Sequence, residues 1–211
     1  MRRFANFFRD QRAAGAAEFA LVLPVALLFL LGLIDVGRYA WAFNQAEKAT
    51  QIGARWAAAT TPIPGGNTNN GLLNYSFAVS SGVQQGTTVP NTLFDKVICT
   101  SSGGTASCTC TVNGAGSCPF NSAADQATFD LLANRMFQIW GGVSKDSIRV
   151  EYAWSGLGFS GDPTGPDIQP LITVSLENNR FPLWFILGNT VPLPTSQYTI
   201  TAEDSFGTYS N

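Results

Sequence analysis

A carboxylate, Glu18, stands at the edge of an uncharged apolar run that extends from Phe19 to Ile34. A charge that faces hydrocarbon is costly unless it is neutralised, so an ionisable residue at this place predicts a functional site with a cationic partner. The chemistry of such a site is charge compensation, without chemical turnover. Its position raises the question of which cation meets Glu18.

The chain contains no histidine, which excludes several kinds of catalytic site. The Ser-His-Asp and Cys-His arrangements and the H-E-x-x-H zinc helix all need an imidazole as base or ligand. No phosphate-binding loop is visible either, so we expect no enzyme activity and no cofactor. A net charge of −2 with only 12% charged residues argues against a nucleic-acid partner.

Four cysteines lie in a glycine- and serine-rich stretch: Cys99, Cys108, Cys110 and Cys118. An even number in an exported loop predicts two disulfides, which would hold together a segment with few apolar residues. A Cys108–Cys110 bridge is the least favoured pairing, because residues two apart on an extended chain rarely reach disulfide geometry. A zinc site is the weaker alternative, since the paired C-x2-4-C spacing is missing.

Two carboxylates, Asp162 and Asp167, lie in a loop rich in glycine and proline between residues 155 and 170. They could ligate calcium, but no ordered series of oxygen ligands accompanies them. Solvated turn residues are therefore the favoured interpretation.

A long helix has to position Glu18. The apolar run is short of the roughly 20 residues that span a bilayer, but the helical pattern continues through Trp41 if Asp35 and Arg38 are accommodated. These two residues are three apart, so they share one helical face, where they can pair or snorkel at the membrane interface. Tyr39 and Trp41 suit the aromatic belt of that interface.

No helix breaker follows until the prolines at 62 and 64, so the predicted helix extends from about Ala16 to about Ala59. Its second half emerges from the membrane as a stalk. Small residues recur there at every fourth position, and two alternatives remain open: they pack on the chain's own globular part, or they form a face for another helix. The two rows are Ala42, Ala46, Thr50, Ala54, Ala58 and Ala49, Gly53, Ala57.

Arginines dominate the segment before the apolar run. Against the single acid Asp10 stand Arg2, Arg3, Arg9 and Arg12, and the positive-inside rule predicts a cytoplasmic N-terminus with everything after the run exported. A plain uncleaved anchor and a cleaved signal peptide with the site Ala40-Trp41-Ala42 are both alternatives for this segment. The charged residues just before that site and the unbroken helix through it disfavour the signal peptide.

The segment after the cysteines predicts a helix and a sheet. A capping box, Ser122 with Asp125, opens an amphipathic helix that Gly141 and Gly142 end. Three alternating strands follow within 147–154, 171–178 and 197–204, and their single apolar faces predict an antiparallel sheet with helices on one side. The apolar face of the helix is formed by Phe129, Leu132, Met136 and Ile139.

The fold class predicted from these elements is α+β: a long N-terminal transmembrane and stalk helix, packed on an antiparallel sheet head with one further helix. The connection before the last strand, "FPLWFILGNTVPLP", is strongly apolar and broken by prolines. It is too short for a second membrane span. It is therefore either folded over the core or an exposed patch for a membrane surface or a partner.

The first quarter of the chain resembles the N-terminal signature of TadE-like proteins, the pilin-like assembly components of bacterial tight-adherence pili. In that family a basic leader and a glycine precede Glu-Phe or Glu-Tyr, then an apolar run, an acidic-x-Gly-Arg step and a Gly-Ala-Arg helix. The order of elements after the cysteines is also weakly similar to these proteins. The residues that carry the resemblance are Glu18, Phe19, Pro24, Asp35, Gly37, Arg38, Gly53, Ala54 and Arg55.

The resemblance implies processing by a prepilin peptidase and a partner for Glu18, the new N-terminal amine of a subunit. The family's glycine usually lies five residues before the glutamate, and that position here is Ala13. Cleavage after Ala13, before Ala14, keeps the spacing to Glu18. Cleavage after Gly15 keeps the glycine, and no cleavage is the third alternative.

The sequence thus divides into a basic leader (1–15), a transmembrane and stalk helix (16–60), a loop-rich disulfide-bearing region (61–121) and an α+β head (122–211). We expect a pilin-like component of a surface pilus, single-pass in the bacterial inner membrane. The expected partners are the lipid bilayer, other pilin-like subunits and the pilus assembly machinery. A membrane-anchored binding or adhesion module is the alternative, and an anchored enzyme is the least favoured class.

Overall fold

The computed structural model describes residues 12–112, 117–163, 165–185 and 189–202, with side chains from residue 15 onward. The chain divides into two compact units, one formed by residues up to Trp41 together with 180–191, the other by residues 42–179 together with those from Pro192 on. The helices are α2 (Arg12–Ala59), α3 (Phe77–Ser80), α4 (Gln126–Ile139) and the 3-10 turn η1 (Lys145–Ser147). The strands are β1 (Lys96–Ser102), β2 (Thr105–Thr111), β3 (Ile148–Ala153), β4 (Leu171–Leu176), β5 (Arg180–Pro182), β6 (Thr190–Pro192) and β7 (Ser196–Thr201).

Helix α2 is one continuous element of 48 residues, which confirms the predicted long N-terminal helix. It begins four residues earlier than the predicted start at Ala16, continues through Pro24 and ends at Ala59, as predicted. The hydroxyl of Thr60 donates to the carbonyl of Trp56 at 2.8 Å and so satisfies one of the carbonyls that a helix end leaves without a partner. Pro62 then prevents continuation.

The part of α2 in the first unit has the composition of a membrane span. From Gly15 onward the helix contains a window with a mean hydropathy of 2.6, and by length and composition it can cross a bilayer. The 20 residues from 15 to 34 extend for about 30 Å, the thickness of a bilayer's hydrocarbon core. Their large side chains are exposed on all sides of the helix, as lipid contact requires.

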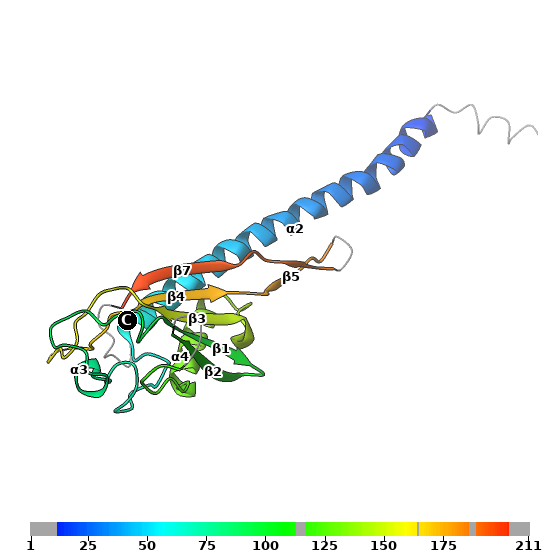
Figure 1. Cartoon of the computed structure of the whole chain (residues 1–211). Helices are drawn as coiled ribbons and strands as arrows, with labels where there is room; N and C mark the ends of the chain where they lie inside the picture. Colours follow the sequence, from blue (N-terminus) through cyan, green and yellow to red (C-terminus); the bar gives the residue numbers. More distant parts are fainter. Residues whose placement is uncertain (1–11, 113–116, 164, 186–188, 203–211) are drawn as a thin grey trace, which may run out of the picture. The chain divides into compact units, whose positions relative to one another are not determined.

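The second unit is built on a five-stranded antiparallel sheet in the order β2-β1-β3-β4-β7 (Figure 1). In register, Val97 lies opposite Tyr152, and Tyr152 lies opposite Ile172, so the apolar positions of three strands share one face. These side chains are at most 1% exposed. The predicted α+β class with a one-faced antiparallel sheet is confirmed.

The buried face of this sheet is covered by α4 and by the second half of α2. Along α2, the small residues Ala42, Ala46, Ala49, Ala54 and Ala57 are all 2% exposed or less. A methyl group built on Gly53 would lie 2.8 Å from Sδ of Met136 in α4 and 3.4 Å from Cγ1 of Val174 in β4. The rows of small residues therefore pack on the chain's own head, which was one of the two alternatives left open by the sequence.

The start of α4 differs from the prediction. Asp125, not Ser122, is the N-cap, and its carboxylate accepts hydrogen bonds from the amides of Ala127 at 3.0 Å and Thr128 at 3.3 Å. The helix cannot begin earlier, because Ala124 forms an antiparallel bridge with Pro64 and the preceding segment is extended. The predicted apolar face is correct for Phe129, Leu132 and Met136, which are buried.

Strands β1 and β2 were not predicted. They lie in the segment that we expected to be rich in loops, and β1 pairs with β3 in the middle of the sheet. The two disulfides are Cys99–Cys108, which joins residues directly opposite each other on β1 and β2, and Cys110–Cys118. Two bridges without a Cys108–Cys110 pair agree with the sequence analysis, and no free cysteine remains.

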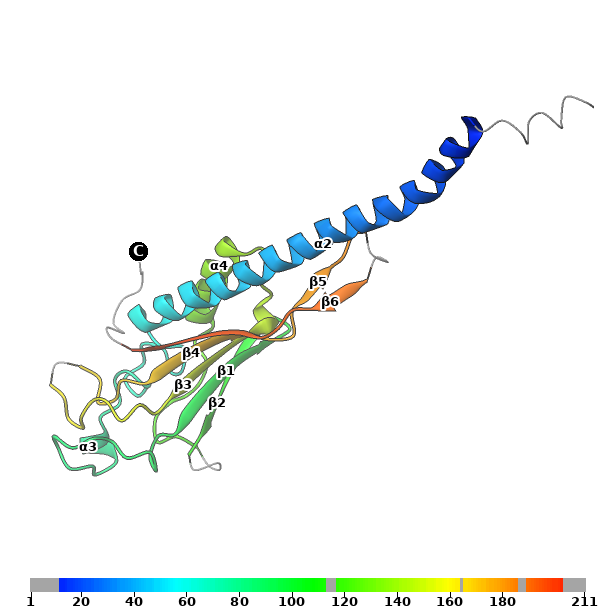
Figure 2. The same cartoon turned by 90° about the horizontal axis from the view of Figure 1, so that it is seen from above.

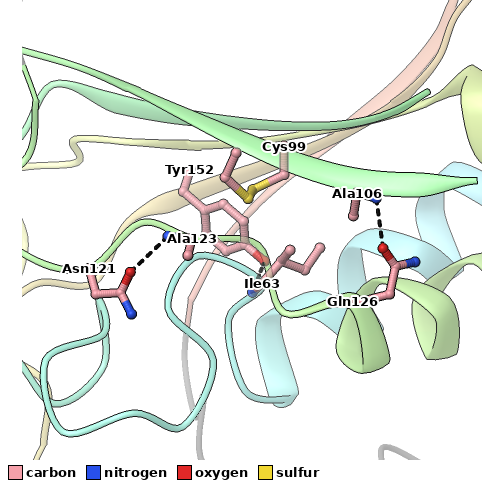
Figure 3. Close-up of a disulfide and its surroundings, with 8 residues drawn as sticks. Ile63, Cys99, Ala106, Asn121, Ala123, Gln126 and Tyr152 are labelled. Carbon is pink, nitrogen blue, oxygen red and sulfur yellow. Dashed lines mark hydrogen bonds between the residues drawn. A yellow bond between two sulfur atoms is a disulfide. The ribbon is translucent and has the colours of Figure 1, made fainter.

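A buried tyrosine ties the segment after α2 to the sheet (Figure 3). The hydroxyl of Tyr152 accepts a hydrogen bond from the amide of Ile63 at 3.1 Å, close to Cys99. Burial raises the pKa of Tyr152, so the neutral phenol persists far above neutral pH. On the other side of the close-up, the side chain of Gln126 accepts from the amide of Ala106 at 2.7 Å and connects α4 to β2.

Gly53→Leu should destabilise the head by about 1–3 kcal/mol, because the new side chain meets Met136 and Val174 in a filled core. Gly37→Leu is the matched control on the same helix, since nothing lies within 4 Å of a methyl group at that position. Thermal unfolding of the full chain in detergent, followed by circular dichroism, measures both. Equal melting temperatures for the two variants would contradict the packing described here.

Replacing Cys99 and Cys108 together by alanine should destabilise the head by about 2–3 kcal/mol, as expected for a bridge that closes a short loop. Denaturant unfolding of the oxidised full chain and of the variant measures this difference. The parent protein should contain no thiol that reacts with an alkylating agent before reduction. Four alkylated cysteines in unreduced, correctly localised protein would refute both disulfides.

Candidate functional site

The residues predicted to act in processing and assembly lie on the first turns of α2. Ala13 and Ala14 are helical in backbone, and nothing lies within 4 Å of a methyl group built on Gly15. Glu18 and Phe19 are exposed, and Glu18 forms no ion pair with any side chain that the structure describes, from residue 15 onward. The arginine-rich leader before Arg12 lies outside the described residues.

The predicted pair at the other end of the apolar run is present. Nη1 of Arg38 lies 3.0 Å from Oδ1 of Asp35, and the spacing of three residues places both on one helical face. The Asp35 side chain is 1% exposed, and that of Arg38 is 26% exposed. A buried carboxylate needs more than one partial partner, because the cost of removing it from water is several kcal/mol.

The apolar connection after β4 supplies the further partners. It forms a hairpin of β5 and β6, in which the amide of Leu183 donates to the carbonyl of Asn189 at 2.9 Å. The guanidinium of Arg180 donates to the hydroxyl of Thr190 at 3.3 Å. Figure 2 shows this hairpin beside α2. The connection is therefore folded, and it belongs to the same unit as the first part of α2.

Two successive backbone amides of the hairpin point at the Asp35 carboxylate. The amide of Trp184 donates to Oδ1 at 3.2 Å, and the amide of Phe185 donates to Oδ2 at 2.8 Å. Successive backbone N–H groups form a concave anion site, and hydrogen bonds to a charged acceptor are stronger than neutral ones. Both oxygens of Asp35 are thus satisfied by residues about 150 positions away in sequence.

Aromatic rings of the hairpin enclose the other member of the pair. Cζ of Arg38 lies 3.5 Å from the ring centroid of Trp184 and 5.0 Å from that of Phe181. The Phe181 ring also contacts Tyr39 edge-on, with centroids 6.1 Å apart. Stacking of a guanidinium on aromatic rings is favourable, so Arg38 pairs with Asp35 and binds the hairpin at the same time.

We call Asp35, Arg38, Phe181, Trp184 and Phe185 the Asp35 clamp. Its parts come from one helical turn and one hairpin, and strands β1 to β4 lie between them in the chain. Sequence reasoning found the Asp35–Arg38 pair but missed the hairpin. The signal that could have revealed it is the combination of a carboxylate beside an apolar run with a distant connection that is itself apolar and aromatic.

Of the two carboxylates in the 155–170 loop, Asp167 has a structural role. Asp167 is only 5% exposed, so the expectation of a solvated turn residue was wrong for it. Its oxygens accept from the amides of Phe77 at 2.6 Å and Gly161 at 2.9 Å, which joins the loop to α3. Among the described residues there is no group of three or more metal-ligating side chains.

Comparison with known proteins finds a family similarity in the first part of the chain. Residues 13–55 match the family of TadE-like proteins. The matched segment contains Glu18, the apolar run and both helical members of the Asp35 clamp, and it ends at Arg55 within α2. No curated protein and no solved structure matches the chain.

Asp35→Ala should release the hairpin from the TadE-like helix. Loss of the carboxylate should raise hydrogen exchange at Trp184 and Phe185 by about 10-fold or more, since hydrogen bonds to charged groups contribute about 1.5–3 kcal/mol. Exchange of the full chain in detergent, resolved by mass spectrometry of the peptide containing both residues, measures this. Glu47→Gln, an exposed charge removal on the same helix, is the control and should leave that peptide unchanged.

Proposed function

We propose that this protein is a pilin-like component needed to assemble a tight-adherence type surface pilus, and that it acts by helix packing and by charge compensation at Glu18. The match of residues 13–55 to TadE-like proteins carries this proposal. It associates the chain with a pilus system through the very segment that contains the membrane-spanning helix. The role is structural and involves no bond making.

The two carboxylates that flank the apolar run support a specific part for Glu18. Asp35 and Glu18 are about 25 Å apart along α2, near opposite ends of the span. Asp35 is satisfied within its own chain by the Asp35 clamp. Glu18 is exposed and has no ion pair among the described side chains, which begin at residue 15. Its position favours a cation on another molecule.

The proposed cation is the N-terminal amine of a neighbouring processed subunit. A prepilin peptidase would create this amine by cutting after Ala13 or after Gly15, a few residues before Glu18. Two opposite charges that meet in hydrocarbon neutralise each other, and removing one partner leaves the other uncompensated at a cost of several kcal/mol. Charge compensation thus gives one register between neighbouring helices.

The proposed location is the bacterial inner membrane, with the N-terminus in the cytoplasm and the head exported. The arginine-rich leader supports this orientation through the positive-inside rule. The two disulfides support it independently, because disulfides persist in oxidising compartments outside the cytoplasm. The proposed partners are the bilayer, other pilin-like subunits and the assembly machinery.

Glu18→Gln should leave membrane insertion and folding of the head intact, yet abolish pilus assembly, because the amine of the neighbour would lie unpaired in hydrocarbon. Glu18→Asp should assemble pili at a reduced level. The measurement counts surface pili in cells that carry each variant at matched protein levels. Glu47→Gln removes an exposed carboxylate from the other half of the same helix and should assemble normally.

The opposite result has a clear physical meaning. If water in the headgroup region solvates Glu18, the net value of any ion pair falls to about 0–1 kcal/mol. Glu18→Gln would then produce pili at the parental number. That outcome would defeat the charge-compensation mechanism and would favour a membrane-anchored binding module, whose head binds its ligand without the helix.

A further inference from the structure

The Asp35 clamp holds two exposed aromatic side chains beside the membrane-spanning helix. Trp184 is 67% exposed and Phe185 is 42% exposed, although the backbone amides of both are bound to a buried carboxylate. On the helix itself, Val36 is 61% exposed and Trp41 is 60% exposed. Large apolar side chains from two distant segments therefore gather, exposed, within one unit.

We propose that the hairpin tip, Trp184 and Phe185, inserts into the interface of the lipid bilayer beside the emerging helix, and that the Asp35 clamp holds it there. The inference rests on the membrane anchoring contained in the proposed function, but not on pilus assembly or on Glu18. It gives the chain a second membrane contact that the family match of residues 13–55 does not include.

The depth of the tip in the bilayer follows from the hydrogen bonds. Asp35 is the first residue after the apolar run, so it marks the end of the hydrocarbon span. Because the amides of Trp184 and Phe185 bind this carboxylate directly, at 3.2 and 2.8 Å, their side chains start from the same level of the helix. That level is where tryptophan is enriched in membrane proteins, since its ring is apolar and its N–H is polar.

The surroundings favour lipid over a protein partner. The exposed aromatic tip is bound to Asp35, directly after residues 15–34 of α2, whose exposed apolar surface has the composition of a membrane span. The two charged side chains at this level are already paired, as the edge of hydrocarbon requires: both oxygens of Asp35 accept hydrogen bonds, and Arg38 is ion-paired and stacked on Trp184. A pair open to water would need no such enclosure.

A second contact beside the helix has a mechanical consequence. A lone transmembrane helix can rotate about its own axis, whereas a hairpin fixed to one face and immersed in the interface sets which face points along the membrane plane. The hairpin would thus fix the direction in which the remaining faces of the span, and the exposed Glu18 among them, meet neighbouring molecules.

Fluorescence quenching by brominated lipid tests the tip. The full chain and its Trp184→Phe variant are reconstituted in phosphatidylethanolamine–phosphatidylglycerol vesicles, with or without bromine near the top of the acyl chains. The fluorescence of the parent minus that of the variant is the emission of Trp184. This emission should fall by about half or more in brominated vesicles, as for a tryptophan at the interface. A difference signal equal in both kinds of vesicle would overturn the proposal.

The same measurement tests the clamp. In the Asp35→Asn background, the Trp184 emission is again obtained by subtracting the fluorescence of a chain that also carries Trp184→Phe. Bromine should quench this emission much less than in the parent, because the amide group of asparagine cannot accept hydrogen bonds at both oxygen positions. Phe185→Pro removes the donor to Oδ2 without altering the helix and should have the same effect. Glu47→Gln is the control and should quench like the parent.

Each result decides one part of the proposal. Quenching of Trp184 that persists in both Asp35→Asn and Phe185→Pro would refute the clamp as the device that holds the tip. The vesicles contain no pilus machinery, so these results are independent of the number of pili that Glu18→Gln produces. Failure of the lipid contact and failure of the proposed function are therefore distinguishable.

Discussion

The structure depends on one helix that has to suit two surroundings in succession. Over residues 15–34 the helix carries large, exposed apolar side chains on every side, which suits contact with lipid and not packing in a protein core. Over residues 42–59 it carries alanines and Gly53, which let α4 and β4 approach its backbone closely. The sheet of the second unit would have an uncovered apolar face without this second half.

The change between the two surroundings falls in the short segment around Asp35. A carboxylate at this position would be destabilising if it faced hydrocarbon. Asp35 is instead buried within the protein, away from both lipid and water. The hairpin encloses it with two backbone amides, and Arg38 adds the opposite charge. The sequence places the Asp35 carboxylate near the end of the apolar run, and its enclosure by the hairpin and Arg38 makes the buried charge stable.

Local pattern predicted most of the elements, because their cause is local. The period of apolar residues, together with the prolines at 62 and 64, gave α2 and its end, and strict alternation gave β3, β4 and β7. The pairing of β1 with β2 was not predicted, because β2, "TASCTCT", has small and polar side chains. The stability of such a strand comes from its cross-strand partners. The start of α4 was misplaced because a bridge between Ala124 and Pro64, a long-range contact, extends the segment before Asp125.

For the candidate site, too, only the local part could be predicted from the sequence. An i,i+3 spacing reveals the Asp35–Arg38 pair, since a helix places both residues on one face without help from the rest of the chain. The hairpin partners depend on where the chain returns after β4, and no periodicity contains that information. The sequence left two alternatives for the connection, folded over the core or an exposed patch. It forms a hairpin in the unit of the first part of α2, with Trp184 and Phe185 exposed.

The disulfides add a condition on where this fold can exist. Strand β2 is an edge of the sheet, and Cys99–Cys108 and Cys110–Cys118 tie its residues to β1 and to the segment before α4. An edge strand of small polar residues has little apolar area with which to hold itself in place. The covalent bridges supply that stability only in an oxidising compartment. The segment without any charge between Lys96 and Asp125 is thus suited to the exported side of a membrane, the side to which the leader arginines direct it.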